Sequence, residues 1–94
     1  MNEHHVSDDE LDELRRLCTS ATPAPWRAMV EGRDHSSGDS FIMVGGDDDR
    51  DEDMYVSRDS GPAIASDLDF IAAARNYLPR LIDEIAELRR QREH

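Results

Sequence analysis

The chain has 94 residues, with 22 acidic against 11 basic side chains and a formal net charge of -11. Binding to nucleic acid or anionic lipid normally requires Lys and Arg to neutralise phosphates, so this charge argues against direct binding to DNA, RNA or a membrane surface. The length fits one domain, and a hydrophobic content of 37% with few aromatic residues predicts a small core of Leu, Ile, Val and Ala.

The N-terminal sequence and the cysteine content predict a cytoplasmic protein. The start of the chain has neither the basic region nor the apolar run of a signal peptide, and no segment approaches the roughly 18 apolar residues of a membrane span. Residues 1–6 are expected to form a flexible end. Cys18 is the single cysteine, so neither an internal disulfide nor a cysteine zinc cluster can form, and we expect a buried, inert thiol.

A helix is predicted from about Asp8 to Thr19. Ser7 and Glu10 have the spacing of a capping box, and apolar residues then recur at helical intervals. The helix is expected to end before Pro23 and Pro25, because each proline removes a backbone donor and holds the residue before it extended.

Short strands are predicted next, over Trp26–Glu31, Ser40–Val44 and Met54–Arg58. The segments between them are rich in turn-forming residues, so an antiparallel meander is the simplest topology. The second connection, residues 45–53, is expected to be an acidic loop.

A helical pattern occupies the C-terminal part of the chain. Ser66 and Asp69 have the spacing of a second capping box, and an apolar stripe follows them. A proline deep in a helix costs about 3 kcal/mol, so Pro79 predicts a break or kink near residues 75–78. Asn76 is then expected to cap a new helix.

The order of these elements predicts one α+β domain over residues 1–94. It consists of an N-terminal helix, a three-stranded antiparallel meander, and a C-terminal broken helix or helix pair packed on one sheet face. A domain of this size buries only a little over about 60% of its unfolded surface, so dimerisation would add stability.

The segment DDDRDED is the strongest local departure from an ordinary sequence. Repulsion between its carboxylates keeps it in water, and its field attracts cations or basic proteins over roughly 8 Å at physiological salt. Acidic loops also occur as solvated connectors, so solubility alone is the competing interpretation. If the segment binds a partner, we expect the surface to include acids of the first helix. The expected binding residues are Asp47, Asp48, Asp49, Asp51, Glu52, Asp53, Asp8, Asp9 and Asp12.

Two segments carry a family resemblance: ATPAPW at Ala21–Trp26 and DFIAAARN at Asp69–Asn76. A TPxPW turn after an N-terminal helix, followed by an FIAAARN helix and a charged C-terminal helix, resembles the small Ead/Ea22-like proteins of phages and prophages. Members commonly have glycine where this chain has Ala24. The resemblance implies an accessory role in a host cell and assigns no activity to particular residues.

The expected function is non-enzymatic inhibition of a basic host protein. Closely spaced carboxylates on a small domain resemble a nucleic-acid backbone and would compete for the basic groove of a nucleic-acid-handling protein. Electrostatic steering would make association fast. The target would be a nucleic-acid-processing or defence protein of the host, so the protein would act in the manner of an anti-CRISPR or another anti-defence inhibitor.

A self-assembling structural or regulatory module is the alternative. A heptad-like stripe in the C-terminal helix would let two helices pair across a twofold axis. The pattern covers less than two heptads, and packing on the chain's own sheet competes with pairing. The expected dimerisation residues are Leu78, Leu81, Ile85 and Leu88.

Catalysis and a structured metal site are not expected. The sequence contains no G-x-S-x-G, P-loop or glycine-rich dinucleotide motif. Acids alternate along residues 47–53, but an EF-hand loop would need a glycine and a bidentate acid where this chain has Glu52 and Arg58. We therefore predict no enzyme activity, no cofactor and no dedicated metal ligands.

Overall fold

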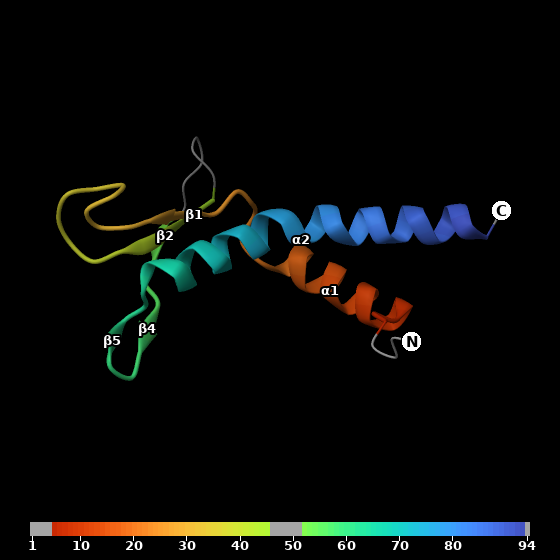
Figure 1. Cartoon of the computed structure of the whole chain (residues 1–94), viewed down its shortest axis with the longest axis horizontal. Coiled ribbons are helices and arrows are strands. Elements are labelled where there is room, and N and C mark those ends of the chain that lie inside the picture. The colour runs from red at the N-terminus through yellow and green to blue at the C-terminus, as the bar shows by residue number, and fades with distance from the viewer. Residues whose placement is uncertain (1–4, 46–51, 94) are drawn as a thin grey trace.

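The structure, a computed structural model, describes residues 5–45 and 52–93 and has an α+β arrangement. The predicted fold class and the antiparallel order β1-β2-β3 are confirmed. A small antiparallel hairpin, β4-β5, leads into the last helix (Figure 1). The elements are α1 (Asp8–Ser20), β1 (Arg27–Met29), β2 (Phe41–Val44), β3 (Glu52–Met54), β4 (Ser57–Arg58), β5 (Gly61–Pro62) and α2 (Ala65–Arg92).

The central strand β2 supplies the core of the sheet. Its side chains alternate, so that Ile42 and Val44 are buried while their neighbours in the strand are only half-buried. Ala28 of β1 and Met54 of β3 pair with Ile42 from either side. Leu68 of α2 completes the cluster, so the first half of α2 covers one face of the sheet.

The predicted third strand was too long. We expected it to run from Met54 to Arg58, but β3 ends at Met54 and β4 begins at Ser57. β4 pairs with β5 instead of extending the sheet, and Arg58 stands opposite Gly61 in that hairpin. The positive φ of Gly61, 139°, is a backbone conformation that glycine adopts without strain, which allows the tight turn.

Helix α1 begins as its sequence predicts and extends one residue beyond the predicted end. The Oγ of Ser7 accepts a hydrogen bond from the Glu10 N–H at 3.0 Å, and the Glu10 carboxylate accepts one from the Ser7 N–H at 2.8 Å. Among the named elements α1 packs only against α2, and it buries Leu11. It lies beside the C-terminal half of α2, away from the sheet (Figure 1).

Helix α2 is one continuous helix, so the predicted break is wrong. Its N-cap is Ile64, which makes no side-chain cap, so the second capping box does not form either. Pro79 lies inside the helix, whose axis bends where its teal turns give way to blue ones (Figure 1). The helix continues because both halves bury apolar side chains, Leu68 and Ala72 on one side of the proline and Ile82 on the other.

The molecule is elongated, with principal extents of 55 × 33 × 21 Å. The sheet and the β4-β5 hairpin form one end, and α1 with the second half of α2 forms the other (Figure 1). Within the described residues, no helix is long and apolar enough to cross a membrane.

Candidate partner-binding surfaces

The two segments that carry the family resemblance contact each other. The side chain of Asn76 accepts a hydrogen bond from the Trp26 N–H and donates one to the Trp26 carbonyl, each 2.8 Å long. Asn76 therefore does not cap a helix, as the sequence had predicted. Its amide pairs with the backbone of the residue that leads into β1, much as a neighbouring strand would.

Arg75 extends this contact to the end of α1. Its guanidinium donates to the carbonyls of Thr22 and Cys18, at 3.0 and 3.1 Å, and lies 5.9 Å from the ring centre of Trp26. The indole N–H of Trp26 also donates to the Thr22 carbonyl. A cation at the C-terminal carbonyls of a helix satisfies acceptors that the helix itself leaves open. Arg75 and Asn76 thus fasten α1, the proline turn and β1 to one point on α2.

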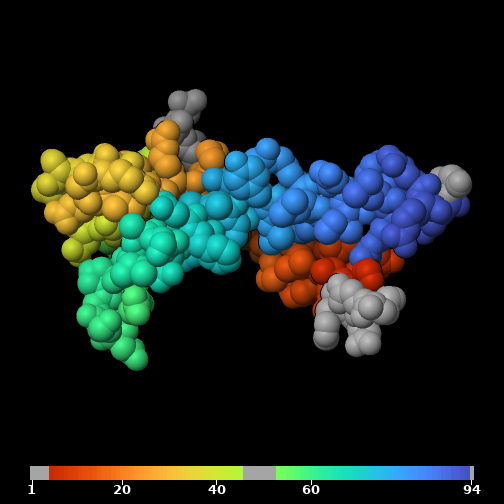
Figure 2. Space-filling view, in the orientation of Figure 1, coloured from red at the N-terminus to blue at the C-terminus, as the bar shows by residue number. Residues whose placement is uncertain are grey.

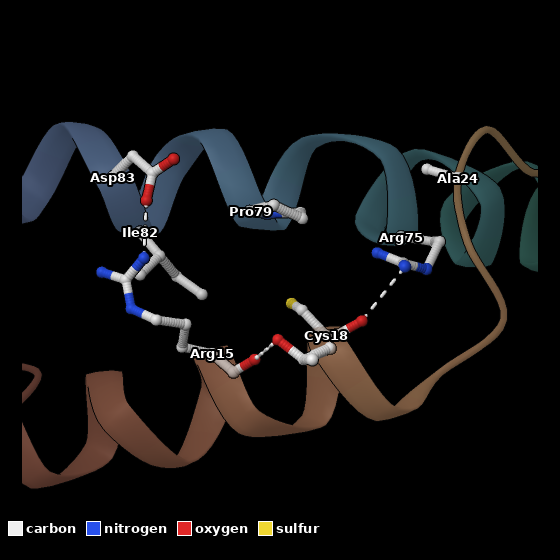
Figure 3. A pocket seen from close by; sticks show the side chains of 8 residues that line it. Arg15, Cys18, Ala24, Arg75, Pro79, Ile82 and Asp83 are labelled. Carbon is white, nitrogen blue, oxygen red and sulfur yellow. Dashed lines mark hydrogen bonds and ion pairs between the residues drawn. The ribbon is translucent and has the colours of Figure 1, made fainter.

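A cleft of about 420 Å³ separates α1 from α2 next to this junction (Figure 3). The Arg15–Asp83 ion pair, 2.6 Å long, links the two helices at one end of it. Cys18 is half-buried, against the expected full burial, and its sulfur points into the space between the helices (Figure 3). The guanidinium groups of Arg15 and Arg75, which line the cleft, both donate hydrogen bonds to acceptors within the protein. The lining residues are Arg15, Cys18, Thr19, Ala24, Arg75, Pro79, Ile82 and Asp83.

The predicted acids of α1 are exposed at the end of the molecule that lies away from the sheet. Asp8 forms a 2.6 Å ion pair with Arg89 near the end of α2. In the part of the chain that the structure describes, Asp9 and Asp12 have no ion pair. Carboxylates in the first turn complement the positive end of the helix dipole, so they stabilise α1 as well as charging its surface.

The other predicted acids belong to the opposite end. Asp47, Asp48, Asp49 and Asp51 lie outside the described residues. Glu52 begins β3, and Asp53 is half-buried opposite Met43 of β2. The sheet that carries Asp53 is separated from the start of α1 along the length of the molecule (Figure 1). The structure therefore does not bring Asp53 together with Asp8, Asp9 and Asp12 in one patch.

The predicted dimerisation residues divide between two faces of α2. Leu78 and Ile85 are half-buried, whereas Leu81 and Leu88 are 54% and 52% exposed. Two aromatic residues that the sequence analysis did not assign to this site are exposed as well, Phe70 at 73% and Tyr77 at 53%. Their signal in the sequence is the seven-residue interval from 70 to 77, repeated from 81 to 88.

These exposed residues form a continuous row on α2. Together with exposed Ala74 and Glu84, their intervals of three and four place them on one side of the helix. We call this row the α2 stripe: Phe70, Ala74, Tyr77, Leu81, Glu84 and Leu88. Figure 2 shows α1 lying along one side of the second half of α2. The guanidinium of Arg80 lies 4.4 Å from the ring centre of Tyr77 at the border of the stripe.

Metal ligands are not clustered in the described residues: no group of three or more His, Cys, Asp or Glu side chains there could hold an ion. The fold defines a small, elongated α+β protein, and its sequence has a net charge of -11. Comparison of the chain with protein-family models, with curated proteins and with solved structures found no match in any of the three.

Proposed function

We propose that this is a non-enzymatic binding protein that attaches through its carboxylates to a basic surface of another protein. The observation that carries the proposal is the exposure of Asp9 and Asp12 on α1 without an ion pair among the described residues. The run of acids over residues 47–53 adds further charge to a chain of net charge -11. Charges that the fold does not neutralise attract a cationic partner and speed its association.

The partner class that fits this charge is a basic, nucleic-acid-handling protein of a host cell. Such a protein has a groove that neutralises phosphates, and a small acidic domain occupies that groove in place of nucleic acid. Inhibition of a host defence or nucleic-acid-processing protein, in the manner of an anti-CRISPR, is the activity we assign to this binding.

The test is capture from host lysate on the immobilised protein, followed by measurement of the association rate with the purified captured protein at two salt concentrations. Neutralising Asp48, Asp49, Asp51 and Glu52 together, or Asp9 and Asp12 together, should slow association and reduce its salt dependence. Asp39 and Asp59, exposed acids of other loops, provide the matched control when neutralised as a pair. Equal rates and equal salt slopes in all variants would refute the charged-surface proposal.

Self-association is a second candidate function, and the α2 stripe favours it. Large exposed apolar side chains gathered on one face of a small protein mark an interaction site. Leu81 and Leu88 belong to the predicted dimerisation set and are exposed, so they are accessible to a second chain.

A further inference from the structure

The α2 stripe has the geometry of one strand of a coiled coil. Its members occupy alternating a and d positions of a heptad, from Phe70 to Leu88, over about 27 Å of helix. The residues that the fold uses for its own core, Leu68, Ala72 and Ile82, lie outside the stripe. The helix therefore carries two apolar faces, of which only one is covered.

The charges along this helix indicate what covers the second face. The first turn of α2 contains the acid Asp67, and the last turn contains Arg89, Arg90 and Arg92. Arg89 is paired with Asp8 and Arg90 with Glu87, so among the described residues Arg92 is the last-turn cation that has no ion pair within the chain. A partner helix with acid at its start and cations at its end, running the other way, would match both ends. A second copy of this chain has that distribution. A uniformly basic partner would instead meet the cations of the last turn.

We propose that two copies of the protein pair through the α2 stripe as an antiparallel helix pair. This proposal deepens the second candidate function, because it rests on self-association and names the face and the direction. Antiparallel pairing places Asp67 near Arg92 of the second copy, whereas parallel pairing would place the basic last turns side by side.

The spacing of the large side chains fits a twofold axis near Pro79. Phe70 and Leu88 are equally far from that residue along the helix, and so are Tyr77 and Leu81. An antiparallel register that sets Phe70 against Leu88 of the second copy therefore also sets Tyr77 against Leu81. Each large apolar side chain of the stripe then meets an apolar partner, and Glu84 meets the small Ala74 of the second copy. The surface is self-complementary, as an isologous interface requires.

The interface is small. If each of the eight large side chains covers about 100 Å² of exposed surface, they bury roughly 800 Å² before the flanking residues are counted. Stable interfaces bury about 1,200 to 2,000 Å² in total, so we expect dissociation in the micromolar range.

The first test is the mass of the full chain by sedimentation equilibrium, over a dilution series from low to high micromolar. We expect the wild type to reach twice its monomer mass of 10.7 kDa at the upper end. Leu81→Asp and Leu88→Gln should each remain at the monomer mass. Leu17→Asp is the matched control, because Leu17 is also exposed, at 48%, but lies on α1. It should dimerise like the wild type.

The second test is the direction of pairing. Ala73 and Glu87 are exposed beside the stripe, on the same border as Arg80. Ala73→Cys and Glu87→Cys chains, each with Cys18→Ser, should form a mixed disulfide when combined and little disulfide alone. A mixture that forms no more disulfide than each chain forms alone would overturn the antiparallel arrangement.

The outcomes distinguish the proposal that the α2 stripe is the interface from the broader proposal that the protein self-associates. A wild type that is monomeric at every concentration refutes both the stripe and the second candidate function. A dimer that survives Leu81→Asp and Leu88→Gln refutes the stripe but keeps self-association. Far-ultraviolet circular dichroism checks that each variant is folded. If Leu81→Asp does not fold, the mass of Leu88→Gln decides the test.

Discussion

The carboxamide of Asn76 pairs with both backbone polar groups of Trp26, through two hydrogen bonds of 2.8 Å. The contact joins residues fifty positions apart in the sequence. It holds the start of β1 against the middle of α2, next to the place where Arg75 reaches the end of α1. The fold therefore depends on a polar junction as well as on its small apolar core.

Replacing Asn76 with Ala should lower the free energy of unfolding by about 2 kcal/mol, because it removes two hydrogen bonds and leaves a half-buried N–H and carbonyl without partners. Asn76→Asp retains the acceptor and loses the donor, so its stability should fall between those of Asn76→Ala and the wild type. Urea denaturation followed by Trp26 fluorescence measures both. An Asn76→Ala variant as stable as the wild type would show that the junction contributes nothing.

Arg75→Lys tests the other half of the junction. An ammonium group cannot donate to the Thr22 and Cys18 carbonyls in the geometry of the planar guanidinium, so we expect a loss of about 1 kcal/mol. The melting temperature from circular dichroism reports this loss. Arg58→Lys, at an exposed position in β4, is the control and should melt with the wild type. Equal melting of all three proteins would exclude a role for the guanidinium geometry.

The elements whose signals are local could be predicted from the sequence. The contacts by which Arg75 and Asn76 form the junction could not be predicted from it. The capping box of Ser7 and Glu10 forms as expected because both partners lie within one turn. Ser66 and Asp69 have the same spacing, but α2 begins earlier, at Ala65, and Asp69 instead binds Arg33 through two hydrogen bonds of 3.0 Å. A capping pattern cannot show that a distant arginine competes for its acid.

Pro79 misled the prediction for a related reason. Its local cost favours a break, but the packing of both halves of α2 opposes one, and that packing is set by the tertiary fold. The candidate site was likewise predicted from local spacing, and its exposure is set by the tertiary fold. Heptad spacing pointed to α2 and to Leu81 and Leu88, but which of the two apolar faces stays open depends on where α1 lies.

Low pH should weaken the contact between Arg33 and Asp69 at the start of α2. Hydrogen bonds from the Arg33 guanidinium hold the pKa of Asp69 below its ordinary value of 3.8, and the backbone N–H of Val30 does the same for the pKa of Asp34. A lowered folded-state pKa means that the folded protein releases protons more readily than the unfolded chain. Both groups therefore stabilise the fold above about pH 3.8, and this contribution is lost as the pH falls through their folded-state pKa values.

Asp69→Asn should flatten the acid side of the stability profile, since it removes one of the carboxyl groups whose pKa the fold lowers. Urea midpoints measured across the acid range for this variant and the wild type give the comparison. Asp59→Asn serves as the control, because Asp59 is exposed in the turn between β4 and β5. If Asp69→Asn keeps the full acid dependence of the wild type, the ion pair with Arg33 does not form in solution.

Truncation of two adjacent residues on α2 should change the free energy of unfolding by very different amounts. Ile82 is 1% exposed and belongs to the face that packs within the protein, whereas Leu81 belongs to the open α2 stripe. In dilute solution, where the chain is monomeric, Ile82→Ala should lower the free energy of unfolding by about 3 kcal/mol, because it leaves a cavity in a packed site. Leu81→Ala should change that free energy by less than about 0.5 kcal/mol, as surface substitutions do.

At high protein concentration Leu81→Ala should lose stability relative to the wild type, because only the wild type gains from pairing. Equal losses for the two variants in dilute solution would show that α2 is rotated relative to the arrangement described, with its stripe already covered by the protein's own fold.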